Sequence, residues 1–125
     1  MLLTIAFGLF LIAHGLVHVL WLVPRPDDPK WPFDVSRSRM LIKTSPTTLR
    51  LVGTVLVSLA MAEFVLAGLG VLGVPALSGV WRVVAIVGAA DSLAVIALFW
   101  NRQFVFGAAL NVAIVLAAVL GWPRP

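Results

Sequence analysis

Residues 2–23 read LLTIAFGLFLIAHGLVHVLWLV, a stretch of 22 residues without Asp, Glu, Lys or Arg. About 20 apolar residues in a helix cross the hydrocarbon core of a bilayer, so this run is long enough to span a membrane. Three prolines and three charged residues follow between Pro24 and Pro29 and stop any helix. The stretch therefore predicts a first transmembrane helix over about residues 2–23.

Three further apolar runs of similar length follow. Ser45 can cap the free amides of a helix that begins at Pro46, and Gly73-Val74-Pro75 closes that helix. The last two runs meet at Asn101-Arg102-Gln103, which we take as a tight turn, because one helix through both runs would be about 69 Å long. We expect an all-α fold, an integral membrane four-helix bundle in a single transmembrane domain over 1–125, with helices at about 2–23, 46–72, 78–100 and 102–122.

Composition limits the function classes. The chain has 125 residues, of which 62% are hydrophobic and 11% charged, far from the balance of a soluble domain. It has no cysteine, which excludes disulfides, thiolate metal sites and the four-helix quinone-reducing enzymes that depend on a Cys pair. The net charge is +4, and the basic residues cluster in one loop, where attraction to membrane lipid explains them more simply than nucleic acid does. The first residues lack the basic segment of a secretory signal, so we expect a mature helix there.

Charge also predicts orientation. Loop 24–45 alternates aromatic and basic residues and lies either in the headgroup region or in solvent as a plain loop. Seven Lys and Arg on one side against two on the other predict a cytoplasmic loop 24–45, both termini outside, and a multi-pass protein of the plasma (inner) membrane. Four tryptophans fall near predicted helix ends, where we expect at least three to anchor in lipid. The seven basic residues are Arg25, Lys30, Arg37, Arg39, Lys43, Arg50 and Arg102, the two are Arg82 and Arg124, and the tryptophans are Trp21, Trp81, Trp100 and Trp122.

Ionisable residues inside the spans are the main functional signal. At membrane depth such groups cost several kcal/mol unless they are paired or hydrated, so they are expected to face the bundle interior. His14 and His18 share a helix face with Phe7, Leu11 and Trp21. At 1.5 Å per residue from the cytoplasmic helix ends, His14, Asp91 and Asn111 lie about 12 to 15 Å deep, His18 about 8 Å and Glu63 about 22 Å.

Small residues should bring the last two helices together. We expect Gly88, Ala89, Gly107 and Ala108 to allow a close approach there. Asn111 could then hydrogen bond to Asp91 or to His14.

Three interpretations of this polar set remain open. Two imidazoles four residues apart and a carboxylate from a neighbouring helix could bind a divalent metal through His14, His18 and Asp91. A histidine beside an acid could instead transfer protons, in chemistry on a lipophilic substrate or in proton-coupled transport along His18, His14, Asp91 and Glu63. The set could also be interhelical glue in an accessory subunit. A haem is not expected, because both histidines project from one helix and cannot approach opposite faces of an iron.

Two motifs carry a resemblance. His14-Gly15-Leu16-Val17-His18, and Phe106-Gly107 followed by Asn111, resemble an H-G-[LI]-x-H element in the first helix and an F-G…N element in the fourth helix of small bacterial four-helix membrane proteins. The resemblance implies the helix layout and no activity. The size is similar to that of small multidrug resistance transporters, but the acidic residue of their first helix is replaced here by His14. The layout is also similar to sterol-isomerase and sigma-2-receptor-like bundles, which bind lipophilic amines and sterols.

These observations lead to one preferred hypothesis. We expect a left-handed bundle whose interior holds His14, His18, Glu63, Asp91 and Asn111 around a small cavity that recognises a small lipophilic molecule. Acid/base conversion of that molecule would use His14 and Asp91 as the proton-transfer pair, with His18, Glu63 and Asn111 in the binding site. The alternatives are a proton-coupled transporter acting as a homodimer, and a non-catalytic subunit with a membrane-complex partner.

Overall fold

The computed structural model describes residues 1–24 and 26–123, and its regular elements there are all helical. Four helical spans are long and apolar enough to cross a membrane, at Leu2–Trp21, Pro46–Val71, Trp81–Leu98 and Arg102–Leu120. Arg25 and Arg124, which entered the orientation count, lie outside the described residues. In chain order the elements are α1 (Leu2–Val17), the 3-10 turn η1 (His18–Trp21), α2 (Pro46–Val71), the short α3 (Pro75–Ser78), α4 (Trp81–Leu98), the 3-10 turn η2 (Arg102–Phe104) and α5 (Val105–Leu120).

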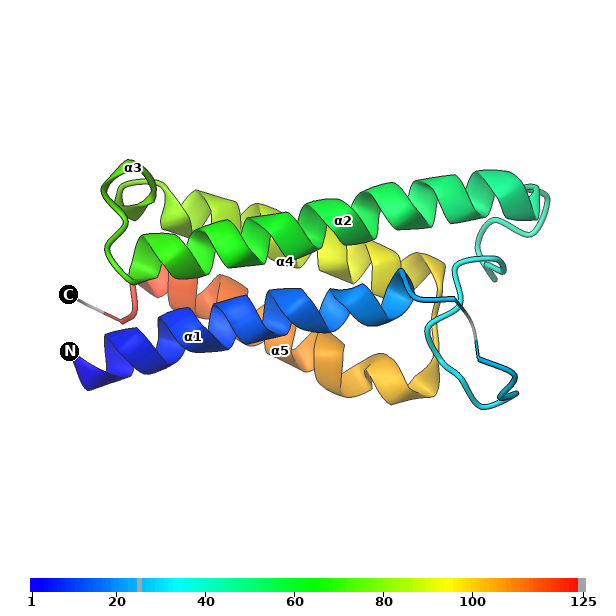
Figure 1. The fold of residues 1–125 in the computed structure, drawn as a ribbon, viewed down its shortest axis with the longest axis horizontal. Helices are drawn as coiled ribbons and strands as arrows, with labels where there is room; N and C mark the ends of the chain where they lie inside the picture. The colour runs from blue at the N-terminus through cyan, green and yellow to red at the C-terminus, as the bar shows by residue number, and fades with distance from the viewer. Residues whose placement is uncertain (25, 124–125) are drawn as a thin grey trace.

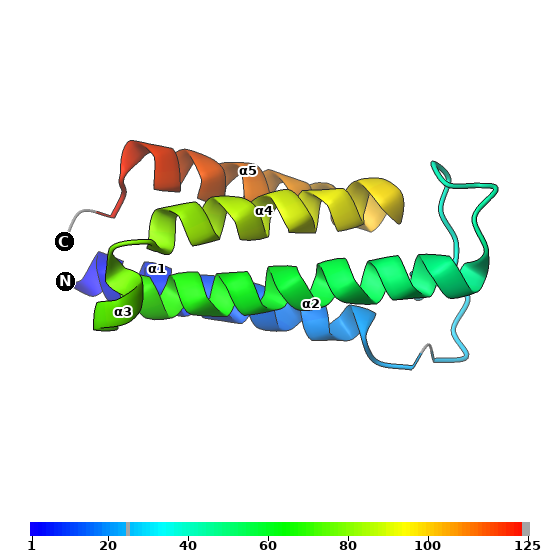
Figure 2. The same cartoon turned by 90° about the horizontal axis from the view of Figure 1, so that it is seen from above.

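The four long helices run side by side and alternate in direction (Figure 1). The closest backbone packing joins α2 to α1 and to α4, and α4 to α5. Seen from above, α4 and α5 form one pair and α1 and α2 the other (Figure 2). The pair α1 and α5 is not among those with several close backbone contacts, so side chains close the seam between these two helices.

Local sequence explains where the helices begin and end. Ser45 accepts a hydrogen bond from the backbone amide of Thr48, with Pro46 in the first turn, as predicted for the start of α2. At the predicted turn, the side chain of Asn101 accepts a hydrogen bond from the amide of Gln103 and caps η2. The third long helix begins three residues later than expected, because residues 75–78 form the separate short helix α3.

Apolar side chains cover the outside of the bundle as well as filling it. On α5, Phe106 is 77% exposed and Leu120 is 73% exposed, whereas Ile114 is buried. A soluble helix would carry polar residues on such an outer face. The interior contains two clusters, one around Phe64 and one around Trp21 nearer the loop end.

The tryptophans only partly follow the expectation that at least three of them anchor in lipid. Trp100 and Trp122 are exposed, as lipid anchors would be, and Trp81 is half-buried. Trp21 is buried, as expected for the inward stripe of the first helix, and packs against Phe104 with ring centroids 4.8 Å apart. Its position on the inward stripe of the first helix outweighs the preference of tryptophan for the membrane interface.

Glycines set the close approach of α1 and α2. A Cβ atom on Gly68 would lie 2.6 Å from the carbonyl oxygen of Gly8, and one on Gly15 would lie 2.9 Å from that of Met61. The expectation for Gly88 was wrong, since this glycine packs against Glu63 on α2 rather than against α5. A Cβ atom on Gly107 would lie 3.5 Å from Ile96 on α4, which is an ordinary van der Waals contact.

Candidate functional site

His18 marks a change of helical geometry within the first span. Its backbone amide bonds to the carbonyl of Gly15, three residues back, so α1 tightens into the 3-10 turn η1 at this point. The carbonyl of His14, which an α-helix would pair with that amide, accepts a hydrogen bond from Nδ1 of the His18 ring at 3.1 Å. Nδ1 also lies 3.2 Å from the carbonyl oxygen of Gly15. The ring is therefore fixed by its own helix.

A chain of hydrogen bonds runs from His18 across three helices. Nε2 of His18 lies 2.9 Å from Oγ of Ser92 on α4. The same Oγ accepts a hydrogen bond from Nδ2 of Asn111 on α5 at 2.8 Å. Oδ1 of Asn111 lies 3.2 Å from Nε2 of His14, back on α1. His18, Ser92 and Asn111 are buried, and His14 is half-buried.

The donors and acceptors determine which atom donates and which accepts at each step of this chain of hydrogen bonds. Backbone carbonyls only accept, so Nδ1 of His18 carries the proton and Nε2 of the neutral ring accepts from the hydroxyl of Ser92. That hydroxyl accepts in turn from the amide NH₂ of Asn111, which leaves Oδ1 of Asn111 to accept from Nε2–H of His14. The two neutral histidines thus hold opposite tautomers.

The open end of the chain is Nδ1 of His14. In the tautomer just derived, this nitrogen has a lone pair and no hydrogen. The structure gives Nδ1 no hydrogen bond. A buried atom without a partner would stand beside Trp31 Nε1 and Glu63 Oε2, the only buried side-chain polar atoms without a partner in the described part of the chain, and Nδ1 of His14 is not one of these. Nδ1 of His14 is therefore accessible from outside the protein. It is an unsatisfied acceptor held in place by Asn111.

Two phenylalanine rings pack against the imidazoles of His14 and His18. Phe64, fully buried on α2, meets the His14 ring edge-on with centroids 4.8 Å apart and lies 5.8 Å from the His18 ring. Phe10 stacks on the other side of His14 at 5.8 Å. These contacts restrict both rings to one orientation without supplying a further polar partner.

A small cavity opens beside the chain, in the seam between α1 and α5. Its volume is about 70 Å³, which corresponds to roughly two waters at about 30 Å³ each. Above it the seam is bridged by His14 and Asn111, and at the loop end it is closed by Trp21 and Phe104. Exposed Val17 and half-buried Gly107 also line it, so it reaches the outer surface. We refer to this cavity as the α1/α5 crevice; it is lined by His14, Val17, His18, Trp21, Phe33, Ser92, Val95, Ile96, Phe104, Gly107 and Asn111.

The two acids within the spans, Glu63 and Asp91, are half-buried and form a separate pair. Glu63 on α2 and Asp91 on α4 lie close enough for their carboxyl groups to interact. Two carboxyl groups this close can share a proton, which relieves the repulsion between two negative charges. The second oxygen of Glu63, Oε2, is buried and has no partner among the described residues. The pair therefore offers a proton-binding site within the spans.

The predicted site residues thus divide into two groups. His14, His18 and Asn111 come together, and the expected bond from Asn111 to His14 is present. Asp91 joins Glu63 instead, because its neighbour Ser92 occupies the face of α4 that points at the histidines. Within residues 1–24 and 26–123, no three His, Asp or Glu side chains gather as a metal site would need, so the set His14, His18 and Asp91 does not converge.

Ser92 is the member of this hydrogen-bond network that was not predicted from the sequence. It is uncharged, and serines in helices commonly bond to their own backbone, so it gave no signal of its own. Its position offers a signal in retrospect. Ser92 continues the stripe of small buried residues Ala85, Gly88 and Ala89 along the inner face of α4. A hydroxyl on such a stripe can reach polar groups on a neighbouring helix.

Comparison of the chain with family models, with curated proteins and with solved structures gives no match. The resemblance of the two short motifs to small bacterial membrane proteins therefore stays a prediction.

Proposed function

We propose that this chain is a multi-pass plasma-membrane protein, with both termini outside, that binds a small lipophilic molecule by its polar end in the α1/α5 crevice. The observation that carries the proposal is the accessible lone pair on Nδ1 of His14. A buried network that satisfies every other member and leaves one acceptor open is suited to a ligand that supplies a donor. The ligand would carry a hydroxyl or N–H group.

The size and place of the crevice support binding of one end only. At about 70 Å³ it is smaller than the roughly 300–1,000 Å³ of pockets that enclose whole ligands. It opens in the seam whose outer rim includes exposed Val17. In a bilayer that rim faces acyl chains, so a lipophilic tail can stay in lipid while the polar end reaches His14.

Acid/base conversion would be an extension of the same site. His14 would act as the base through Nδ1, with Asn111 fixing its tautomer through Nε2. Asp91, which the sequence led us to expect beside His14, lies close to Glu63 instead and would not take part.

Native mass spectrometry of gently extracted protein tests the binding proposal. We expect a mass increment on the wild type that is lost in His14→Ala, which removes the acceptor, and in Gly107→Leu, which fills the crevice and leaves the network in place. Gln103→Ala, an exposed change outside the crevice, should retain it. An increment that persists in both site variants, or a bare wild-type chain, would contradict the proposal and favour a non-catalytic accessory subunit.

The Glu63–Asp91 pair favours a second candidate, proton-coupled transport by a homodimer. A proton held between two helices can be released when the helices move apart, which is how a transporter could couple proton movement to its cycle. In proteoliposomes with a pH gradient, such a protein would accumulate a lipophilic amine, and Glu63→Gln would abolish the dependence on the gradient. Absence of gradient-driven uptake by the wild type would exclude this candidate for amines.

A further inference from the structure

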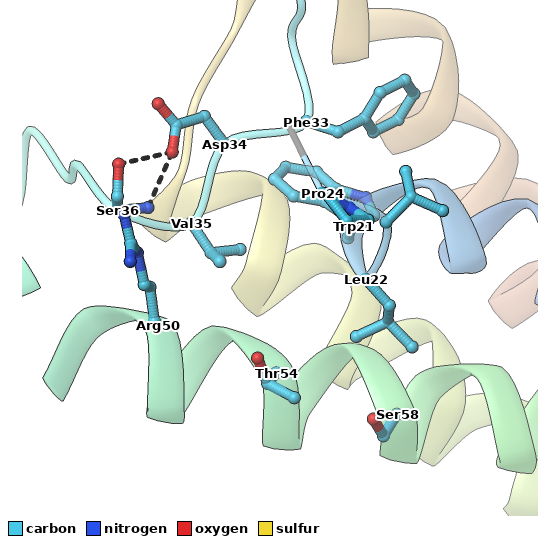
Figure 3. Close-up of a pocket in the computed structure, with 11 residues that line it drawn as sticks. Trp21, Leu22, Pro24, Phe33, Asp34, Val35, Ser36, Arg50, Thr54 and Ser58 are labelled. Carbon is cyan, nitrogen blue, oxygen red and sulfur yellow. Dashed lines mark hydrogen bonds between the residues drawn. The ribbon is translucent and has the colours of Figure 1, made fainter. Parts of the chain in front are cut away.

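A second cavity, separate from the α1/α5 crevice, lies at the loop end of the bundle (Figure 3). Its volume is about 550 Å³, within the range of ligand pockets. One wall is α2, and the opposite wall is formed by the end of the first span and by residues 33–36 of the loop. Trp21 and Phe33 separate it from the crevice, because both residues line the two cavities.

The cavity exists because α2 extends beyond the helix beside it. Gly15 of α1 packs against Met61 of α2. Six residues further along each antiparallel helix, Trp21 comes level with Val55. Residues 46–54 therefore project past the first span by about 13 Å. Figure 1 shows α2 extending beyond α1 at the loop end. With the first span filling the hydrocarbon, this projection lies at the level of the lipid headgroups.

Arg50 is the charged residue of this projection that faces the cavity. It is exposed, and the structure gives its guanidinium no hydrogen bond or ion pair with any described residue. In Figure 3 its side chain rises from α2 toward Ser36. A guanidinium presents a fork of N–H donors that matches a phosphate group. An arginine without a protein partner at headgroup depth is therefore placed to bind a phosphate group.

The cavity changes character along α2, from charged to apolar. Thr54 and Ser58 follow Arg50 at intervals of four residues on the same helix face and contribute hydroxyl groups. Across the cavity from them, on the end of the first span, lie exposed Leu22 and Val23. Asp34 also lines the cavity, but its Oδ1 accepts two hydrogen bonds from Ser36, at 2.6 and 2.9 Å. This order matches a molecule with a phosphate head and an acyl chain.

We propose that this cavity binds an anionic phospholipid, with the phosphate on Arg50, the glycerol oxygens near Thr54 and Ser58, and an acyl chain against Leu22 and Val23. The site does not depend on ligand binding at His14. It would fix the loop end of α1 to α2 and hold Trp21 and Phe33 in the shared wall.

Thermal unfolding of the detergent-solubilised protein, followed by tryptophan fluorescence, tests the site with three additives. Phosphatidylglycerol should raise the unfolding temperature of the wild type, whereas phosphatidylcholine and inorganic phosphate should raise it much less. In Arg50→Gln the half-maximal lipid concentration should rise about tenfold or more, the effect of losing a charge-assisted hydrogen bond. Arg102→Gln removes the same charge at the same end of the bundle, outside this cavity, and should behave as the wild type.

Each other outcome overturns the proposal. Equal stabilisation of Arg50→Gln and wild type would mean that lipid binds elsewhere. Stabilisation by inorganic phosphate alone would mean that the site takes a free anion and not a lipid. If Arg102→Gln weakened the stabilisation by lipid as much as Arg50→Gln does, the effect would come from the net charge of the surface and not from a site at Arg50. Thr54→Val checks the geometry independently, since it keeps the charge and should still weaken the response.

Discussion

Ser92 links the two histidines, because its hydroxyl donates to Nε2 of His18 and accepts from Nδ2 of Asn111. Two buried groups on different helices therefore depend on one small side chain. The network is neutral throughout in the tautomers derived above, which suits an apolar environment, where charges are costly. Buried polar groups are tolerated there as long as each one has its partner.

Ser92→Ala should lower the stability of the protein by about 1–3 kcal/mol, since it leaves His18 Nε2 and Asn111 Nδ2 buried without a protein partner. The free energy of unfolding in detergent measures this. Ser78→Ala is the matched control, because Ser78 is exposed on α3 and bonds only within its own turn. It should stay within about 0.5 kcal/mol of the wild type. Equal stability of the two variants would show that the hydrogen bonds of Ser92 do not hold the helices together.

The sequence argument found three of the four members of the network for a simple physical reason. Histidine and asparagine in an apolar helix are conspicuous, and solvation cost alone directs them inward. Serine carries little such cost, so Ser92 could not be distinguished from a serine that bonds to its own helix. The hydrogen-bond partner of each group could not be predicted either. Burial implies that a polar group needs a partner, but it does not identify that partner.

At the scale of helices, the contact of α1 with α2 depends on the absence of side chains. Gly68→Ala should destabilise the protein by about 1–3 kcal/mol, because the new methyl group would lie 2.6 Å from the Gly8 carbonyl and the Ile12 side chain. Gly107→Ala has room, at 3.5 Å from Ile96, and should gain up to about 1 kcal/mol of helix propensity. Unfolding temperatures of the two variants compare them directly. A Gly68→Ala protein as stable as Gly107→Ala would contradict the close packing.

Element boundaries followed from the sequence, whereas the relative heights of the helices did not. Counting from the end of each helix placed Glu63 about 22 Å deep and Asp91 about 12 to 15 Å deep, yet the two carboxyl groups are close neighbours. The difference arises because α2 projects about 13 Å past the first span. Measured from Val55, where α2 comes level with Trp21, Glu63 is about 12 Å deep. The length of a helix can be predicted from the sequence, but its position along the bundle axis relative to its neighbours is determined by packing.

For the whole molecule, the distribution of basic residues predicts orientation. Because the chain contains no cysteine, single cysteines report accessibility without background. In intact cells a membrane-impermeant maleimide should label Gly79→Cys, between α3 and α4, and should label Lys30→Cys only after lysis. Both positions are exposed in the structure. The reverse pattern would place the termini and α3 in the cytoplasm, and labelling of both in intact cells would argue against a membrane barrier between them.

The direction of the hydrogen-bond chain is the central claim, since it leaves Nδ1 of His14 as the acceptor on which the proposed binding rests. Nitrogen-15 NMR of the imidazole rings measures it directly in the wild-type protein, with His18→Gln and His14→Gln to assign the signals. We expect two neutral rings of opposite tautomer, protonated at Nε2 in His14 and at Nδ1 in His18. A proton on Nδ1 of neutral His14 would contradict the account, because the site would then have no open acceptor.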